Sequence, residues 1–336
     1  MKHAITIAGE DISLVAEEGD TLLRAALRAG IGLPYECNSG GCGSCKVEVI
    51  QGEVEDLWPD ASGLSPRDRR KGRKLACQCR PVSRQVVIKA RPEELPEEEA
   101  RPRRVRARLL ERRRLTHDMA EFSFAPHGEA PPYLPGQYAM FRLPGVQGER
   151  AYSFSSIPEE GVWRFVIRYT GGAATTFLFE ALEADDELTL DAPYGHAWLR
   201  RDVQRDVVLI GGGSGLSPML SIARAMVADP AFAGRTCHFF HGVRTPADIC
   251  TPELLAELDG PGADIDHHVA ISEPESAPDW PGAVGYIHEL VERTLDDLPQ
   301  YEFYFCGPPP MTECVQRMLM LKHKVPFQQL HFDRFF

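Results

Sequence analysis

The chain has 336 residues, of which 43% are hydrophobic and 26% charged, and its formal net charge is -12 at pH 7. This length is too great for one ordinary core and predicts two or three domains, while no apolar run is long enough to cross a membrane. An acidic chain is not expected to bind nucleic acid, and its first residues alternate as a strand instead of forming an export signal, so we expect a cytoplasmic protein without a membrane partner.

Residues 1–92 read as a small α+β domain built from short strands and one helix. Residues 3–15 predict two strands around a turn at Gly9, and residues 21–29 predict a helix with Asp20 as its N-cap. Further strands are expected at residues 46–50 and 86–89.

Four cysteines in this domain have the spacing of iron ligands. Cys37, Cys42 and Cys45 follow the pattern C-x4-C-x2-C, and with the later Cys77 they match plant-type [2Fe-2S] centres. Disulfides suit a chain with nine cysteines poorly, and a zinc site would show two C-x2-C knuckles where one is present. Cys79 is expected on the opposite face of a strand from Cys77, so Cys77 is the predicted fourth ligand. The order of these elements and the spacing of the cysteines together resemble those of ferredoxins, which have the β-grasp fold.

A charged, proline-punctuated stretch at residues 93–102 predicts an exposed linker. Two basic runs, residues 67–74 and 101–114, are interpreted as solvated faces, with a docking role as the alternative. Residues 103–202 then change to spaced strands and one helix at 175–183, which predicts an antiparallel six-stranded barrel. The strands are expected at residues 104–110, 119–124, 138–143, 150–155, 163–169 and 187–191.

Residues 203–336 alternate between strands and helices, which predicts a parallel α/β domain suited to a nucleotide. The strands are expected at residues 207–210, 236–241, 265–270 and 302–306, and the helices at 217–228, 253–258, 287–294 and 311–323. The whole chain is therefore predicted to be a multidomain protein of the α+β and α/β classes, with an α+β domain first, an antiparallel barrel second and a parallel α/β domain third.

The second domain contains residue types suited to a flavin. Arg150, Tyr152 and Ser153 offer a guanidinium for a pyrophosphate, a ring for stacking and a hydroxyl for flavin N5. Gly172 and Thr175 stand where a helix opens, and free N–H groups there favour phosphate. The plain alternative is an ordinary surface strand. The predicted cofactor-binding residues of this domain are Arg150, Ala151, Tyr152, Ser153, Arg168, Gly172, Thr175 and Thr176.

These residues resemble the ferredoxin-NADP reductase superfamily, whose flavin barrel is marked by R-x-Y-[ST] and then G-x-x-[ST]-x-x-L. The chain has both motifs, the second as Gly172, Thr175 and Leu178. Residues 192–195, Ala-Pro-Tyr-Gly, are similar to the superfamily's G-P-x-G turn but depart at the first position. The resemblance implies FAD, with FMN as the alternative.

The third domain carries two segments that are similar to the same superfamily. Residues 211–218 form a glycine-rich turn that runs from a strand into a helix, resembling G-G-[TS]-G-[ILA]-[AST]-P. Residues 306–311 resemble C-G-P-P-x-M, whose cysteine lies beside the nicotinamide C4. Cys306 and Ser153 are therefore the predicted catalytic residues, although Cys306 also suits simple packing at a strand end. The predicted nucleotide-binding residues are Gly212, Gly213, Ser214, Gly215, Pro218, Arg244, Asp248, Gly307 and Pro308.

The choice of nucleotide depends on the end of the second strand of this domain. Arg244 is the one cation there, and Asp248 would repel a 2′-phosphate, so NADH is favoured over NADPH. A local turn between Thr245 and Asp248 explains these residues equally well. The terminal Phe336 is expected to cover the flavin ring, with simple packing as the alternative. The pair at 267–268, His-His, has no carboxylate at ligand spacing, so no metal role is expected there.

The order of the three domains resembles the one-chain reductase components of bacterial aromatic-ring oxygenases, and the toluene monooxygenase reductases most closely. The resemblance implies an enzyme that takes a hydride from NADH onto FAD and passes single electrons through the [2Fe-2S] cluster. The implied acceptor is an oxygenase component or its small ferredoxin or Rieske carrier, with a di-iron monooxygenase favoured. Reductases of Rieske dioxygenases and stand-alone flavin or deoxysugar reductases have the same architecture and are the alternatives.

Overall fold

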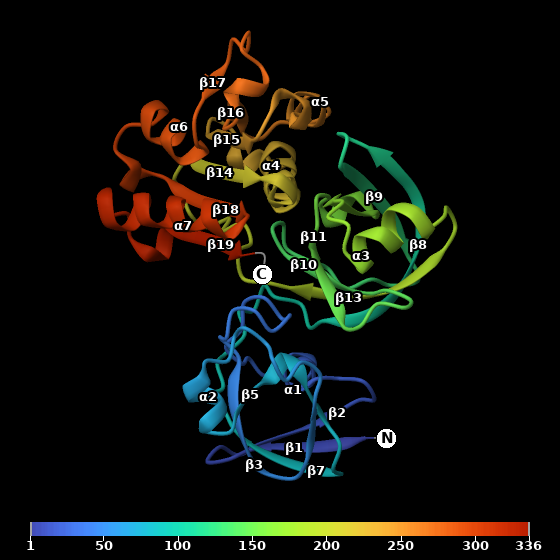
Figure 1. The fold of residues 1–336 in the computed structure, drawn as a ribbon. Helices are drawn as coiled ribbons and strands as arrows, with labels where there is room; N and C mark the ends of the chain where they lie inside the picture. The colour runs from blue at the N-terminus through green and yellow to red at the C-terminus, as the bar shows by residue number, and fades with distance from the viewer. Residues whose placement is uncertain (1, 335–336) are drawn as a thin grey trace.

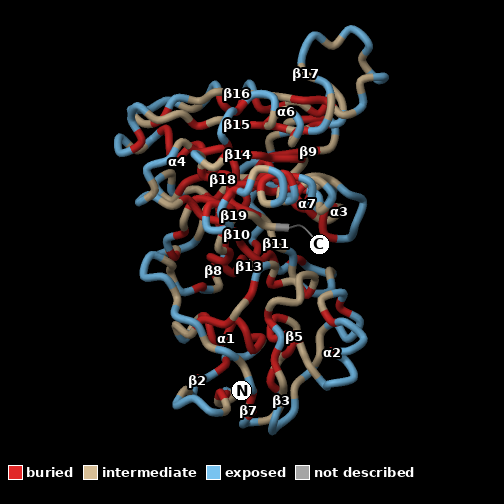
Figure 2. The backbone as a smooth tube through the Cα atoms, turned by 90° about the vertical axis from the view of Figure 1, so that its left-hand side faces the viewer, coloured by how far each residue is buried: buried red, intermediate tan, exposed pale blue. Residues whose placement is uncertain are grey.

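The computed structural model describes residues 2–334 and consists of three parts, each built around its own main sheet (Figure 1). The N-terminal part lies below the other two in Figure 1, and the chain passes from it into an antiparallel sheet and then into a parallel one. Figure 2 shows that buried residues follow the strands, whereas many outer loops and most of α2 are exposed. No helix within residues 2–334 combines the length and the apolar character that crossing a bilayer requires.

The N-terminal part has a five-stranded sheet in the order β2-β1-β7-β3-β5, with β1 and β7 parallel. The strands are β1 (His3–Ile7), β2 (Ile12–Ala16), β3 (Lys46–Gln51), β5 (Arg73–Leu75) and β7 (Gln85–Lys89). The other elements are α1 (Leu22–Arg28), α2 (Pro66–Arg70), the short 3-10 turn η1 (Ala76–Gln78) and the strand pair β4 (Val54–Asp56) and β6 (Cys79–Pro81). The apolar residues of α1 pack on the sheet as one core, as expected for a β-grasp domain.

The predicted N-cap of α1 is wrong by one residue. Thr21 is the cap, because its side-chain oxygen accepts a hydrogen bond from the Arg24 N–H at 3.3 Å. Asp20 is 1% exposed, and its carboxylate instead pairs with Arg28 at 3.1 Å and with Arg104 at 2.5 Å. The acid preceding this helix therefore joins two domains instead of capping the helix.

The middle part is a six-stranded sheet in the order β11-β10-β13-β8-β9-β12, with every neighbouring pair antiparallel. The strands are β8 (Arg103–Arg114), β9 (Met119–Pro126), β10 (Tyr138–Arg142), β11 (Glu149–Ser153), β12 (Trp163–Arg168) and β13 (Glu187–Tyr194). The helix begins two residues earlier than predicted, because Gly172 is the N-cap of α3 (Ala173–Thr176), which continues as a π-helical turn at Phe177–Ala181.

The C-terminal part is a six-stranded parallel sheet in the order β17-β16-β15-β14-β18-β19. The strands are β14 (Val207–Gly212), β15 (Thr236–Val243), β16 (Asp264–Ile271), β17 (Ala283–Val284), β18 (Glu302–Gly307) and β19 (Leu330–Arg334). The helices are α4 (Leu216–Ala228), α5 (Thr251–Ala256), α6 (Ile287–Thr294) and α7 (Pro309–Arg317), and α7 continues as a π-helical turn at Met318–Lys322. Helices α4 and α5 share a core with one face of the sheet, and α6 and α7 share a core with the other.

The connector at residues 93–102 is held at both ends, and most of its residues are exposed, as its composition predicted. The backbone of Glu93 exchanges hydrogen bonds with Gly32 at 2.9 and 3.0 Å. The Glu99 carboxylate is buried and accepts a hydrogen bond from Trp198 Nε1 at 2.8 Å. The connector therefore packs against the first two parts of the chain instead of separating them.

Candidate functional site

The sulfurs of the predicted iron ligands lie together at the top of the N-terminal sheet. The Sγ atoms of Cys37 and Cys42 are 3.3 Å apart, and the Cys45 and Cys77 thiols interact as a second pair. Cys77 lies in η1, whereas Cys79 begins β6 and is buried in the core, where burial raises the pKa of its thiol to about 12. The structure thus places four thiols as two pairs, with Cys79 apart from them.

The surroundings of these thiols fit an anionic iron–sulfur cluster. The backbone N–H groups of Ser39 and Cys42 each donate to Cys37 Sγ at 3.4 Å, and the N–H of Ser44 donates to Cys42 Sγ at 3.5 Å. The left-handed backbone of Gly40 and Gly43, with φ of 94° and 77°, allows the loop to turn these groups inward. Amide donors that converge on sulfur stabilise thiolates and tune the potential of a bound cluster.

A cavity of about 330 Å³, which we call the flavin cavity, opens between the cysteine loop and the antiparallel sheet. Most of the predicted flavin residues line it, and so do three residues of the cysteine loop. From the flavin motifs these are Arg150, Ala151, Tyr152, Ser153, Arg168, Gly172 and Thr175, and from the loop Glu36, Cys37 and Ser39. Thr176, which was also predicted, does not line the cavity.

The geometry of this cavity suits a group with an aromatic ring and an anionic tail. The exposed Arg150 lies near its mouth, and its guanidinium donates to the carbonyls of Gln147 and Glu149 at 3.2 Å each. Thr175 Oγ1 accepts from the Thr170 N–H at 3.1 Å, which fixes the turn that opens α3. Arg168 is held by Asp118 at 2.6 Å. Two guanidinium groups and a helix start therefore supply the positive charge that a pyrophosphate requires.

Sequence reasoning missed Asp333 as a site residue. It lies on β19 beside Cys306 of β18 and also lines the flavin cavity. Its Oδ2 atom is buried and has no hydrogen-bond partner within residues 2–334, and burial raises the pKa of this carboxyl to about 7. A lone acid two residues after His331 in an apolar segment was the available signal, but the strand that buries it was not predicted. A buried polar atom aimed into a cavity is what a bound polar group would satisfy.

The cysteine loop is fastened directly to the flavin sheet. The Tyr138 hydroxyl donates to the Glu36 carbonyl at 2.7 Å, and the Tyr35 hydroxyl accepts from the Gly195 N–H at 3.0 Å. Tyr138 and Tyr194 of the flavin part are continuous with the core of the N-terminal part. Cys37 thus lines the flavin cavity in this arrangement, and the N-terminal part need not move to bring it there.

A second cavity, of about 190 Å³, lies beyond the ends of β14, β15 and β16, and we call it the nucleotide cavity. Its lining includes five of the predicted nucleotide-binding residues, namely Gly212, Gly213, Arg244, Asp248 and Pro308. Ser214 lines the flavin cavity instead, and Arg168 lines both, so the two cavities adjoin. Gly215, Pro218, Cys306 and Gly307 line neither cavity and are buried. Phe336 lies outside the described residues.

Asp248 is engaged in the local turn that the sequence left as an alternative. Its Oδ2 accepts from the Thr245 N–H at 2.9 Å and from the Thr245 hydroxyl at 3.0 Å. Arg244 is exposed at the rim of the nucleotide cavity. Asp248 therefore shapes the turn, and it also lines the nucleotide cavity.

Cys306 is 1% exposed at the end of β18. Burial raises the pKa of its thiol well above the ordinary value, so the group is neutral. A neutral, buried thiol is not suited to act as a nucleophile. Ser153 is 5% exposed, and its carbonyl accepts from the Ser217 hydroxyl at 2.7 Å, which ties β11 to the start of α4.

The close contact between Gly215 and Cys306 predicts a large effect of adding one methyl group. A Cβ at Gly215 would lie 2.1 Å from the Cys306 carbonyl oxygen, and this backbone cannot move aside. Overpacking of this kind costs about 1–3 kcal/mol, which corresponds to roughly 5- to 150-fold. We expect Gly215→Ala to weaken NADH binding by a factor in that range while FAD remains bound, measured by titration of the FAD-loaded protein.

Gly211→Ala is the matched control for this prediction. A Cβ at Gly211 would lie 3.3 Å from Leu216 Cα, a tight contact but a much milder one than the 2.1 Å contact at Gly215. Its effect on NADH affinity should be smaller than that of Gly215→Ala. Equal affinities for the two variants would show that the glycine turn does not support the nucleotide site.

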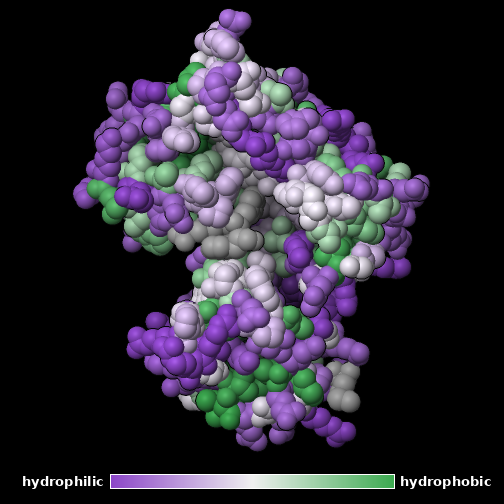
Figure 3. All heavy atoms as spheres, in the orientation of Figure 1, coloured by the Kyte–Doolittle hydropathy of each residue, from purple (hydrophilic) through white to green (hydrophobic). Residues whose placement is uncertain are grey.

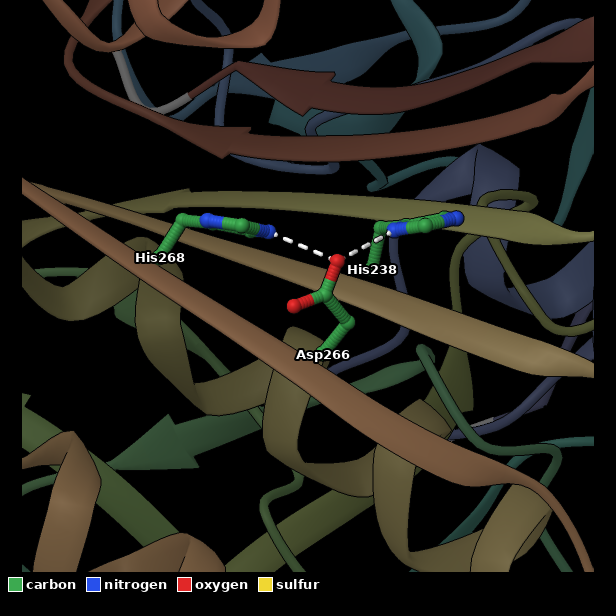
Figure 4. Close-up of side chains that lie close together, drawn as sticks. All are labelled: His238, Asp266 and His268. Atoms are coloured by element: carbon green, nitrogen blue, oxygen red, sulfur yellow. Dashed lines mark hydrogen bonds and ion pairs between the residues drawn. The ribbon is translucent and has the colours of Figure 1, made fainter. Parts of the chain in front are cut away.

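The expectation that the histidine pair has no carboxylate partner is wrong. His238 of β15 and His268 of β16 both bond the same oxygen of Asp266, at 2.9 and 2.8 Å (Figure 4). Sequence reasoning missed this group because His238 comes from a neighbouring strand. The cluster lies towards the beginning of β15 and β16, and the nucleotide cavity lies at the other end of these strands. A hydrogen-bonded group in which two imidazoles share one carboxylate accounts for these residues.

Comparison with known proteins assigns all three parts. A family model described as a 2Fe-2S iron-sulfur cluster binding domain matches residues 5–82, an oxidoreductase FAD-binding domain matches residues 106–198, and an oxidoreductase NAD-binding domain matches residues 209–317. The cofactors are therefore a [2Fe-2S] cluster, FAD and a nicotinamide nucleotide, in agreement with the residues gathered at the two cavities.

Relatives match over nearly the whole length. The chain is 40% identical to the ferredoxin–NAD(P)+ reductase CarAd of Metapseudomonas resinovorans, covering 95% of each chain. It is 38% identical to the ferredoxin–NAD+ reductase component of the alkene monooxygenase system of Xanthobacter autotrophicus, covering 96% of this chain and 98% of that one. Identity to the xylene/toluene monooxygenase electron transfer component XylA of Pseudomonas putida is 32%, covering 100% and 94%.

A solved structure, the ferredoxin reductase in carbazole 1,9a-dioxygenase, superposes with a TM-score of 0.90 at 36% identity, covering 100% of this chain and 99% of that one. The likeness thus extends to the relative arrangement of the three parts and not only to each domain. The chain belongs to the family of FAD- and NAD-dependent ferredoxin reductases of oxygenase systems that carry a plant-type [2Fe-2S] domain on the same polypeptide.

Proposed function

We propose that this protein is the NADH-dependent reductase component of an oxygenase system. The observation that carries the proposal is the shared cavity, in which Cys37 of the cluster loop faces the residues of the flavin motifs. FAD, when bound, accepts a hydride as two electrons and releases them singly, and a [2Fe-2S] cluster carries one electron at a time. Such a chain connects a two-electron donor to a one-electron acceptor.

The residues of the chain serve binding and orientation. We assign Arg150, Arg168 and the turn at Gly172 to the flavin pyrophosphate, and Tyr152 and Ser153 to its ring. The glycine turn at residues 211–215 and Pro308 hold the nucleotide, with the neutral Cys306 thiol beside its ring. Cys37, Cys42, Cys45 and Cys77 hold the two irons. Of these groups, Ser153 and Cys306 are buried, at 5% and 1% exposure, which limits the access of water to the position of the ring.

The acceptor we favour is the hydroxylase of a di-iron aromatic monooxygenase, because relatives include reductase components of phenol and xylene/toluene monooxygenases. A small carrier ferredoxin is the second candidate. It is supported by the relative with 40% identity, which is named a ferredoxin reductase. We place this activity in the cytoplasm, where NADH is regenerated.

Anaerobic mixing with each nicotinamide nucleotide tests the proposal and the choice of NADH. NADH should bleach the flavin absorption of the loaded protein, and kcat/KM for NADH should exceed that for NADPH by at least about tenfold, because the Asp248 carboxylate repels a 2′-phosphate. Addition of a candidate oxygenase should then couple NADH oxidation to product. Failure of NADH to bleach the flavin would contradict the proposed function.

A further inference from the structure

The cysteine loop has one part inside the flavin cavity and another part near the surface. Glu36, Cys37 and Ser39 line the cavity. The later part of the loop is covered by the segment 57–64, whose Gly63 N–H donates to the Gly40 carbonyl at 3.0 Å. The ring of Trp58 packs against Gly40, where an added Cβ would be 2.9 Å from Trp58 Cε3, and this side chain is 43% exposed. An aromatic side chain thus lies between the cluster loop and solvent.

Helix α2 follows this segment and is fixed beside the loop. The Asp68 carboxylate pairs with Lys46 Nζ at 3.0 Å, and Lys46 follows the ligand Cys45 in the chain. The Arg69 guanidinium donates to the carbonyls of Pro59 and Ala61, which ties α2 to the segment that covers the loop. The position of α2 relative to the cysteine loop is therefore set by bonds on two sides.

The two remaining arginines of α2 and its C-cap residue Lys71 lie on the surface. Arg67, Arg70 and Lys71 are exposed, and none of them has a side-chain partner among residues 2–334. Figure 3 shows strongly hydrophilic side chains over this helix. Residues 56–74 carry six basic residues against three acidic ones, whereas the chain as a whole has a net charge of -12. A local positive surface thus adjoins the cluster on an otherwise negative molecule.

Such a charge distribution orients a charged partner. An acidic protein is repelled by most of this molecule and attracted to one area, which raises the rate of productive encounter and fixes the docking direction. Exposed tryptophan and arginine are also the residue types that dominate binding energy at protein interfaces. The exposed acid in the segment, Asp60, weakens this field without reversing it.

We propose that Trp58, Arg67, Arg70 and Lys71 form the docking surface for an electron-accepting protein that presents a cluster of carboxylates around its own redox centre. This inference rests on the proposed function, since it supplies the exit for electrons that enter at the flavin cavity. Entry and exit then use different parts of one cysteine loop, so a partner can bind without displacing the flavin domain.

Charge reversal at the surface tests this inference. An acidic plant-type [2Fe-2S] ferredoxin serves as the probe, and its dissociation constant is measured by calorimetry with the fully loaded chain at low and at physiological ionic strength. Binding by the natural chain should weaken with salt, and the triple variant Arg67→Glu, Arg70→Glu, Lys71→Glu should bind at least about tenfold more weakly. A neutral triple variant with glutamine at the same positions should have an affinity between those of the natural chain and the reversed variant. This variant provides the test if the reversed variant does not fold.

The matched control reverses three exposed cations elsewhere on the same domain, Lys2→Glu, Arg84→Glu and Lys89→Glu. It changes the net charge equally and should retain affinity within about twofold. The proposed docking surface would be overturned if the probe did not bind the natural chain. It would also be overturned if the reversed variant and the control variant lost affinity for the probe equally. Anaerobic bleaching by NADH is recorded on each sample, so a failure of the proposed function is seen separately from a failure of docking.

Discussion

Cys42→Ala is expected to abolish the reduction of cytochrome c by NADH while NADH still bleaches the bound flavin. The Cys42 thiol pairs with that of Cys37 at 3.3 Å and receives the Ser44 N–H, so its removal opens one of the two sulfur pairs. Even an outer-shell partner of a metal site is worth about 10- to 100-fold, so loss of a ligand should lower cytochrome c reduction by more than roughly 100-fold. Ferricyanide reduction, which draws directly on the flavin, should remain largely intact.

Cys79→Ala is the control within the same segment. Cys79 is buried only two residues from Cys77, but it lies in the core and apart from the sulfur pairs. It should retain the rhombic paramagnetic signal of the reduced cluster, whereas Cys77→Ala should lose it. If Cys42→Ala lost flavin bleaching as well at full FAD occupancy, the order of electron transfer would be wrong.

Patterns that are local in the chain predicted most of the fold and the chemistry. The spacing of the cysteines is sufficient for a cluster because one short loop supplies three of the ligands. The alternation of strands and helices after residue 203 is sufficient for a parallel sheet, because such strands need crossover helices. The comparisons confirm the family, the fold and the cofactors that these local patterns predicted.

What the sequence did not predict depends on contacts between distant segments. Asp20 looks like a helix cap until Arg104, from another domain, is placed beside it. The group of His238, Asp266 and His268 needs the register of two strands, and that register is not visible in either strand alone. Asp333 becomes a site residue only because β19 pairs with β18. In each case the partner was too far along the chain to be read from a pattern.

The contact between the cluster domain and the flavin domain depends on a buried group of charges that no motif marks. Asp191 of β13 is 3% exposed and accepts from Arg28 Nη1 at 3.0 Å and Nη2 at 2.5 Å. Arg24, also buried, lies 3.7 Å from the same carboxylate and pairs with Glu149. Two arginines of α1 are thus neutralised by the flavin sheet, which holds the cysteine loop at the flavin cavity.

Asp191→Ala should therefore separate the two domains without damaging either cofactor site. Removing one partner of a buried ion pair leaves charge uncompensated and costs about 3 kcal/mol or more. We expect faster proteolysis of the connector at residues 93–102 and slower reduction of the cluster after the flavin has been reduced, measured by stopped-flow absorbance. NADH should still bleach the flavin at the natural rate, since the nucleotide cavity lies in another part of the molecule.

The control is Asp185→Asn, which removes a carboxylate charge that pairs with Arg108 on the surface and keeps a residue type that tolerates the left-handed backbone there, with φ of 73°. Those two side chains are 76% and 42% exposed, so their pairing contributes only about 0–1 kcal/mol. Its proteolysis and cluster reduction should match those of the natural chain. If Asp191→Ala behaved in the same way, the buried charges would not be what holds the cluster at the flavin, and the tyrosine contacts at Glu36 and Gly195 would have to suffice.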